Sequence, residues 1–110
     1  SMAVTRTNSK EAVTNFTVLK RYNAMSLIEC RLETGRTHQI RVHMSYIGYP
    51  VYGDPKYGYR KDDFSHGQFL HAKKLGFIHP TTQKYMEFES PLPDYFQAKL
   101  DELQEELKDE

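Results

Sequence analysis

The first third of the chain has the composition and the period of β-strands. Residues 12–22 (AVTNFTVLKRY) alternate two sets of side chains, and residues 24–33 (AMSLIECRLE) are rich in apolar, β-prone residues. The apolar positions of the second segment are Leu27, Ile28, Cys30 and Leu32. We therefore expect an antiparallel pair of strands joined at residues 22–25.

A helical period replaces the strand period after this pair. Ile40, Met44 and Ile47 stand at i, i+4 and i+7, which predicts a short helix with one apolar stripe. Thr37 is the expected N-cap, and Gly48 is the expected stop.

The rest of the chain contains one irregular segment and three further elements. Residues 49–60 carry two prolines, two glycines and four tyrosines without a regular period, which predicts an ordered loop. Residues 69–80 and 84–90 are predicted to be two strands, with the turn beginning at Pro80, Thr81 and Thr82. Residues 94–110 are predicted to form an amphipathic helix. Its apolar stripe comprises Phe96, Leu100, Leu103 and Leu107.

Composition limits the class of protein. The chain has 110 residues, 38% hydrophobic and 27% charged, which is typical of one domain with a modest core. No apolar run approaches the ~20 residues of a membrane helix, so no membrane span is expected. Cys30 is the single cysteine, which excludes an internal disulfide, and residues 1–12 lack a secretory signal. Both observations favour a cytoplasmic protein.

The zero net charge hides an asymmetry between the body and the tail. From Asp94 onward there are seven acidic residues and two lysines, so the preceding 93 residues hold 13 basic and 8 acidic residues. A basic body with interleaved aromatic residues suits a polyanion, although solvated basic faces are also common.

Three basic residues, Arg36, His38 and Arg41, lie at the start of the predicted helix, where the helix dipole disfavours cations. An anion is therefore expected nearby. A guanidinium suits phosphate or carboxylate because it donates two hydrogen bonds at once. The equally weighted alternative is that Arg41 pairs with a structural acid. The candidates are Glu29, Glu33 and Asp54.

Residues 31–58 (RLETGRTHQIRVHMSYIGYPVYGDPKYG) resemble the third motif region and following loop of the RluA-type RNA pseudouridine synthases. The segments FLHAKKLGFIHP and FESPLP resemble a later strand pair of that family. The resemblance spans residues 14–107. It implies an α+β fold, with a mixed, mainly antiparallel sheet and flanking helices, and isomerisation of uridine to pseudouridine in structured RNA without cofactor or metal.

The resemblance also implies residue roles. In the family an aspartate attacks a uridine flipped out of the RNA, and the last arginine of GRTHQIR, here Arg41, pairs with that aspartate. Arg36 and His38 are then expected nearer to phosphate or the RNA edge of the site. The predicted RNA-binding residues are Arg36, His38, Gln39, Lys56 and Arg60.

The family's Arg-Leu-Asp motif with its nucleophile does not occur in this sequence in the expected context. The nearest match is KLD at residues 99–101, in the acidic terminal helix, and it carries no weight. Arg41 is therefore expected to lack its carboxylate here, with solvent or a free anion in its place. Residues 1–11 are expected to be a cloning remnant and a flexible segment, and residues 12–110 the C-terminal portion of a catalytic domain.

Other candidates have simpler interpretations. His38 and His43 are five residues apart and off a common helix face, so a metal site is not expected among the histidines. His71 and His79 are expected to be structural. Asp54 is most simply a turn residue that caps local amides.

Two functions of different classes follow. The first is a C-terminal piece of a pseudouridine synthase, inactive alone, acting in the whole protein on RNA, with ribosomal RNA favoured by analogy. The second is a stand-alone, non-catalytic RNA-binding or interaction module derived from this fold. Exposed sheet edges in such a piece favour self-association.

Overall fold

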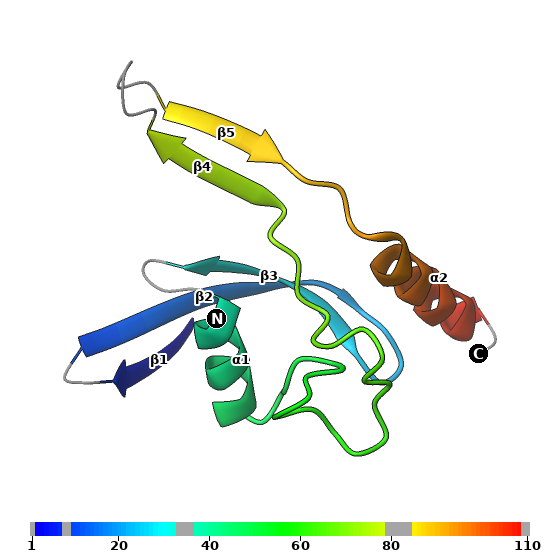
Figure 1. The fold of residues 1–110 in the computed structure, drawn as a ribbon. Helices are drawn as coiled ribbons and strands as arrows, with labels where there is room; N and C mark the ends of the chain where they lie inside the picture. Colours follow the sequence, from blue (N-terminus) through cyan, green and yellow to red (C-terminus); the bar gives the residue numbers. More distant parts are fainter. Residues whose placement is uncertain (1, 8–9, 33–36, 79–84, 109–110) are drawn as a thin grey trace.

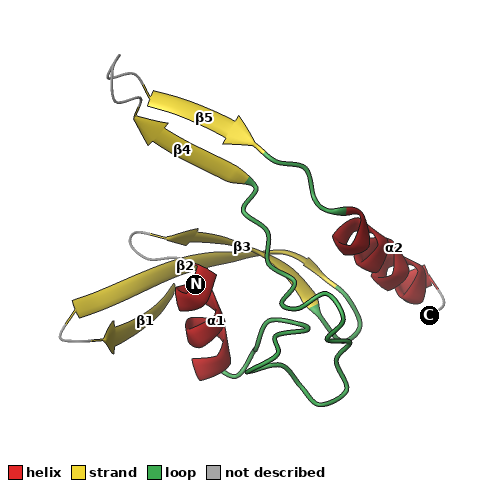
Figure 2. Cartoon of the chain, in the orientation of Figure 1, coloured by secondary structure: helices red, strands yellow, loops and turns green. Residues whose placement is uncertain are grey.

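The computed structural model describes residues 2–7, 10–32, 37–78 and 85–108. The elements, in chain order, are β1 (Met2–Thr7), β2 (Lys10–Arg21), β3 (Ser26–Leu32), α1 (Thr37–Tyr46), β4 (Lys74–Ile78), β5 (Tyr85–Glu89) and α2 (Asp94–Lys108). A long loop joins α1 to β4 (Figure 2). The predicted α+β class is confirmed. All pairs of described strands are antiparallel, and the strands are divided between two sheets.

The predicted first hairpin is present. β2 and β3 pair antiparallel, with Phe16 opposite Cys30, and the amide of Tyr22 closes the turn by donating to the carbonyl of Met25 over 2.8 Å. The register shifts between Val18 and Lys20, which marks a bulge.

Residues 2–7 and 10–11, within the N-terminal segment that was expected to be flexible, lie in strands. Met2–Thr7 form strand β1, which pairs antiparallel with β2, and β2 itself already begins at Lys10. By pairing with β2, strand β1 satisfies backbone amide and carbonyl groups that would otherwise face solvent. A sequence period does not reveal such pairing.

Helix α1 packs against β1 and β2 (Figure 1). Its predicted start at Thr37 is confirmed, and Gly48, with φ of 91°, follows its end in the conformation that glycine tolerates best. Ile40 and Met44 of the predicted stripe are buried, whereas Ile47 is half-buried beyond the last helical turn.

A buried polar network also joins α1 to β2. Gln39 Nε2 donates to the carbonyl of Val13 over 3.1 Å and to Thr14 Oγ1 over 3.0 Å, and His43 Nδ1 lies 2.7 Å from the same Oγ1. Thr14 and His43 are both completely buried. Burial lowers the pKa of His43, so the imidazole is neutral and the Thr14 hydroxyl can donate to Nδ1 while it accepts from Gln39.

Strands β4 and β5 form the predicted second hairpin, which extends away from the three-stranded sheet (Figure 1), although β4 begins at Lys74 and not at residue 69 as predicted. The predicted turn at residues 80–82 lies outside the described residues. The radius of gyration is 15.9 Å, whereas a compact chain of this length would have about 13 Å. The projecting hairpin explains this excess.

Helix α2 confirms the predicted C-terminal amphipathic helix. Phe96 and Leu103 of its stripe are buried, and the other two members, Leu100 and Leu107, are half-buried. The helix contacts the long loop through the rings of Phe96 and Phe69. It also contacts the end of β2 and the β2–β3 turn, where Lys20 Nζ donates to Gln104 Oε1 and Asn23 Nδ2 donates to the Glu106 carbonyl. Neither helix of the described chain has the length and apolarity needed to cross a membrane.

The network at Thr14 gives a stability prediction. Thr14→Val keeps the shape of the side chain but removes the only hydroxyl shared by Gln39 and His43, so it should lower the free energy of unfolding by about 1–3 kcal/mol, as measured by denaturant unfolding. Thr17→Val, at an exposed position of the same strand, is the control and should change the same quantity by less than about 0.5 kcal/mol. Equal effects of the two substitutions would contradict a special role for Thr14.

Candidate active site around Arg41

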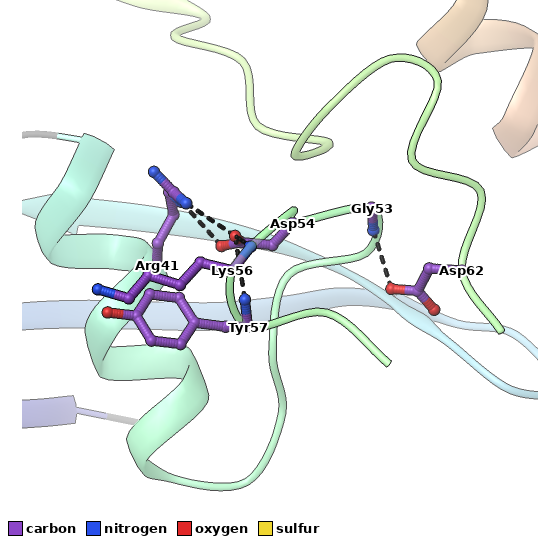
Figure 3. Close-up of polar contacts among 6 residues, drawn as sticks. All are labelled: Arg41, Gly53, Asp54, Lys56, Tyr57 and Asp62. Carbon is purple, nitrogen blue, oxygen red and sulfur yellow. Dashed lines mark hydrogen bonds and ion pairs between the residues drawn. The ribbon is translucent and has the colours of Figure 1, made fainter. Parts of the chain in front are cut away.

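Arg41 on α1 forms a two-pronged ion pair with Asp54 in the long loop (Figure 3). Arg41 Nε donates to Asp54 Oδ2 and Arg41 Nη2 donates to Asp54 Oδ1, each over 2.8 Å. The Asp54 side chain is completely buried, and the Arg41 side chain is 18% exposed. Of the alternatives considered for Arg41, a local acid at Asp54 is therefore the one that the structure contains.

Asp54 also caps its own loop. Its Oδ1 accepts hydrogen bonds from the backbone amides of Lys56 (2.9 Å) and Tyr57 (3.3 Å), which confirms the predicted turn-capping role. The hydrogen bonds from Arg41 and from these amides lower the pKa of Asp54 to about 2, although burial alone would raise it. The carboxylate is thus ionised throughout the neutral pH range.

A second carboxylate, Asp62, fixes the other side of the loop. Its Oδ2 accepts from the amides of Gly53 (3.0 Å) and Tyr59 (3.2 Å). Gly58 packs so closely that an added Cβ would lie 2.6 Å from the Asp54 carbonyl oxygen and 2.8 Å from Asp62 Oδ2. The loop around Asp54 is therefore held together by its own hydrogen bonds.

The ring of Tyr57 lies close to two cationic groups (Figure 3). The guanidinium carbon of Arg41 is 5.9 Å from the centre of the Tyr57 ring, and Lys56 Nζ is 5.2 Å from it. The electron-rich face of a tyrosine attracts cations at such distances. The ring therefore brings a predicted catalytic residue and a predicted RNA-binding residue together.

The other predicted RNA-binding residues differ in their surroundings. His38, Lys56 and Arg60 are exposed, whereas Gln39 is half-buried with its amide nitrogen bonded to β2. Arg36 lies outside the described residues. RNA contact stays a prediction for all of them, and for Gln39 the geometry offers a structural role instead.

Along the Nε–Nη2 edge of Arg41, a protein carboxylate is present where solvent or a free anion was expected to replace the missing nucleophilic aspartate. Asp54, one of the three structural acids considered as partners, supplies it, because the loop after α1 folds back and brings residue 54 to residue 41.

Sequence reasoning missed the structural residues of the site, Thr14, His43 and Asp62. Asp62 has a recognisable signal, since an aspartate three residues after Tyr59 in a glycine-rich turn commonly accepts a nearby backbone amide. The described residues contain no group of three or more potential metal ligands.

Comparison with known proteins finds similarity to RNA pseudouridine synthases. The family model described as RNA pseudouridylate synthase matches residues 1–46. The chain is 58% identical over 94 residues to the Bacillus subtilis protein named uncharacterized RNA pseudouridine synthase YlyB, across 86% of this chain and 31% of that protein. It is 44% identical over 104 residues to ribosomal large subunit pseudouridine synthase D of Neisseria meningitidis, across 84% of this chain and 28% of that protein. The chain thus spans about a third of the length of these relatives.

The packing at Gly58 gives a second prediction. In Gly58→Ala the new Cβ would press on the Asp54 carbonyl, so the loop should shift and the amides of Lys56 and Tyr57 should lose protection from hydrogen exchange. Overpacking of this kind costs about 1–3 kcal/mol.

Gly67→Ala is the matched control. Gly67 has φ of 68° and nothing within 4 Å of the added Cβ, so alanine there brings only backbone strain. It should leave the protection of the Lys56 and Tyr57 amides unchanged, and loss of protection in both variants would contradict the assigned contact.

Proposed function

Given that this chain belongs to the RluA-type family of RNA pseudouridine synthases, we propose that it is part of an enzyme that isomerises uridine to pseudouridine in structured RNA. Relatives named ribosomal large subunit pseudouridine synthase D support ribosomal RNA as the substrate. The proposed site of action is the cytoplasm.

The observation that carries this proposal is the fixed guanidinium of Arg41. A guanidinium has five N–H donors, and Asp54 takes two of them, through Nε and Nη2. The remaining three donors, two on Nη1 and one on Nη2, point away from Asp54 and have no acceptor among the described residues. They are suited to a second carboxylate, the nucleophilic aspartate that the family resemblance expects elsewhere in the whole protein.

In the proposed reaction this aspartate attacks the sugar carbon C1′ of the flipped uridine and the N1–C1′ bond breaks. The freed uracil turns, its C5 bonds to C1′ as the aspartate leaves, C5 loses its proton and N1 gains one. Arg41 keeps the aspartate ionised, because a nearby cation lowers the pKa of a carboxyl group that desolvation would otherwise raise. The role of this chain is to hold Arg41 and to offer a basic surface to RNA.

The proposed RNA surface comprises exposed cations close to this site. His38 lies on the first turn of α1, three residues before Arg41, while Lys56 and Arg60 lie on the loop that carries Asp54. Such cations neutralise phosphates, and an adjacent tyrosine ring can stack on a base. Arg36 and Gln39 remain further proposed contacts. The Gln39 amide nitrogen already donates to β2, so its amide oxygen is the group proposed to face RNA.

The proposed function predicts that activity requires more than this chain. In a uridine-to-pseudouridine assay on bulk ribosomal RNA, the longest natural reading frame that contains the chain should be active and the 110-residue chain should be inactive. Activity of the 110-residue chain would mean that another acid serves as nucleophile, and inactivity of both proteins would favour the non-catalytic RNA-binding alternative.

The isolated chain should also self-associate. The described residues bury only four hydrophobic side chains, Ile40, Met44, Phe96 and Leu103, and Leu19 in β2 is 56% exposed. Sheet edges and apolar surface of this kind favour pairing between copies. Sedimentation of the 110-residue chain should show dimers or larger species, and a strict monomer at high concentration would contradict this proposal.

Arg41→Ala in the whole protein should abolish turnover while RNA binding, measured by filter retention, stays within about threefold, because the residue acts beside the nucleophile. Removing Arg41 leaves Asp54 buried without its cation, so folding must be checked by circular dichroism. Arg41→Lys keeps a positive charge toward Asp54 but not the planar fork, and it should fold normally while losing most of the activity. Wild-type turnover in Arg41→Lys would overturn the proposed role.

A further inference from the structure

Asp54 does more than cap a turn. Its two oxygens have different partners: among the described residues Oδ2 accepts only from Arg41 Nε, whereas Oδ1 accepts from Arg41 Nη2 and from the amides of Lys56 and Tyr57. A turn cap needs one oxygen. The second oxygen serves Arg41 alone.

The carboxylate that holds Arg41 is itself immobile. Besides the bonds to its side chain, the Asp54 amide donates to the Val51 carbonyl over 3.2 Å, and its carbonyl accepts from the Gly58 amide over 2.8 Å. Every polar group of this buried residue is therefore used. Gly58 packs closely on this carbonyl and leaves no room for a Cβ beside it.

Arg41 is fixed at both of its ends. Its backbone belongs to α1, which the Gln39–Thr14–His43 network joins to β2, and its guanidinium is gripped edge-on by Asp54 with the Tyr57 ring nearby. A long arginine side chain would otherwise sample many rotamers. The edge-on grip determines both the plane of the guanidinium and the direction in which Nη1 points.

From this geometry we infer that Asp54 is a positioning residue for the isomerisation, which orients the free edge of the Arg41 guanidinium toward the nucleophilic carboxylate. This inference rests on the proposed function. Because the Asp54 side chain is wholly buried, it is not available to RNA and acts through Arg41. The rate of isomerisation therefore depends on a buried residue that is not part of the RNA-binding surface.

The test uses the whole protein and the isosteric substitution Asp54→Asn. Asparagine can keep its oxygen at the Oδ1 position and so retain the bonds to the amides of Lys56 and Tyr57. Its amide nitrogen then takes the place of Oδ2 and faces Arg41 Nε, donor against donor. The substitution thus spares the turn and removes half of the fork.

We expect Asp54→Asn to lower kcat on the order of 10- to 100-fold with KM within about threefold, because small misplacements of a catalytic group cost rate more than binding. The matched control is Asp62→Asn, whose side-chain oxygen can keep the bonds from the amides of Gly53 and Tyr59, so it removes a charge from the same loop without disturbing the loop or Arg41 and should leave kcat within about twofold. In an Arg41→Lys background, Asp54→Asn should lower kcat by no more than about twofold, since lysine has no fork to orient.

Two results would overturn the inference: wild-type kcat in Asp54→Asn, or the same fold-loss from Asp54→Asn in the wild-type and Arg41→Lys backgrounds. If the wild-type whole protein makes no pseudouridine, the proposed function fails, and the orienting role is then judged by NMR. The Arg41 Nε–H should exchange slowly with water in the wild-type protein and in Asp62→Asn, and rapidly in Asp54→Asn. Slow exchange in Asp54→Asn would overturn the role of Asp54 independently of activity.

Discussion

The buried ion pair between Arg41 and Asp54 is the interaction on which the site depends. Removing an ion from water costs several kcal/mol, and attraction to a partner repays this cost only when geometry is good and the remaining lone pairs are satisfied. Asp54 meets both conditions, with two charge-assisted hydrogen bonds of 2.8 Å and two backbone amides on a side chain that is wholly buried. Its pKa of about 2 is the net result, since the hydrogen bonds outweigh desolvation.

The two partners are buried to different degrees, and this difference matters for function. Asp54 has no contact with solvent, whereas the Arg41 side chain keeps 18% of its surface exposed. The guanidinium is therefore anchored along one edge and open along the other. A fully buried pair would be structural only, and a fully exposed pair would leave the side chain mobile, because exposed ion pairs contribute little.

The sequence predicted the local elements well, because each has a clear period. The i, i+4, i+7 spacing from Ile40 gave helix α1, and the β-prone segments around Phe16 and Cys30 gave the first hairpin. Strand β1 was missed because six residues with no apolar stripe become a strand only through pairing with β2. Its existence depends on a tertiary contact.

The site was predictable in its residue types but not in its pairings. Arg41 was singled out, and Asp54 stood among three candidate acids, yet the loop between them has no period that fixes which acid returns to α1. Gln39 shows the opposite problem. A polar residue on a short amphipathic helix is expected to face solvent. Gln39 instead points toward β2, where its amide donates to the buried hydroxyl of Thr14.

The order of the site does not depend on a large hydrophobic core. The chain is extended, and the β4–β5 hairpin projects from the body without contributing to the Arg41 site. The site is held instead by hydrogen bonds among residues close in sequence: Asp54 and Asp62 bind amides within nine residues of themselves, and Gly53 and Gly58 permit the close approach of the backbone. Because these hydrogen bonds are local, they can stay intact when other parts of a longer protein pack against the exposed surface of these residues. The geometry at Arg41 is therefore the part of this structure that should be retained in the whole protein.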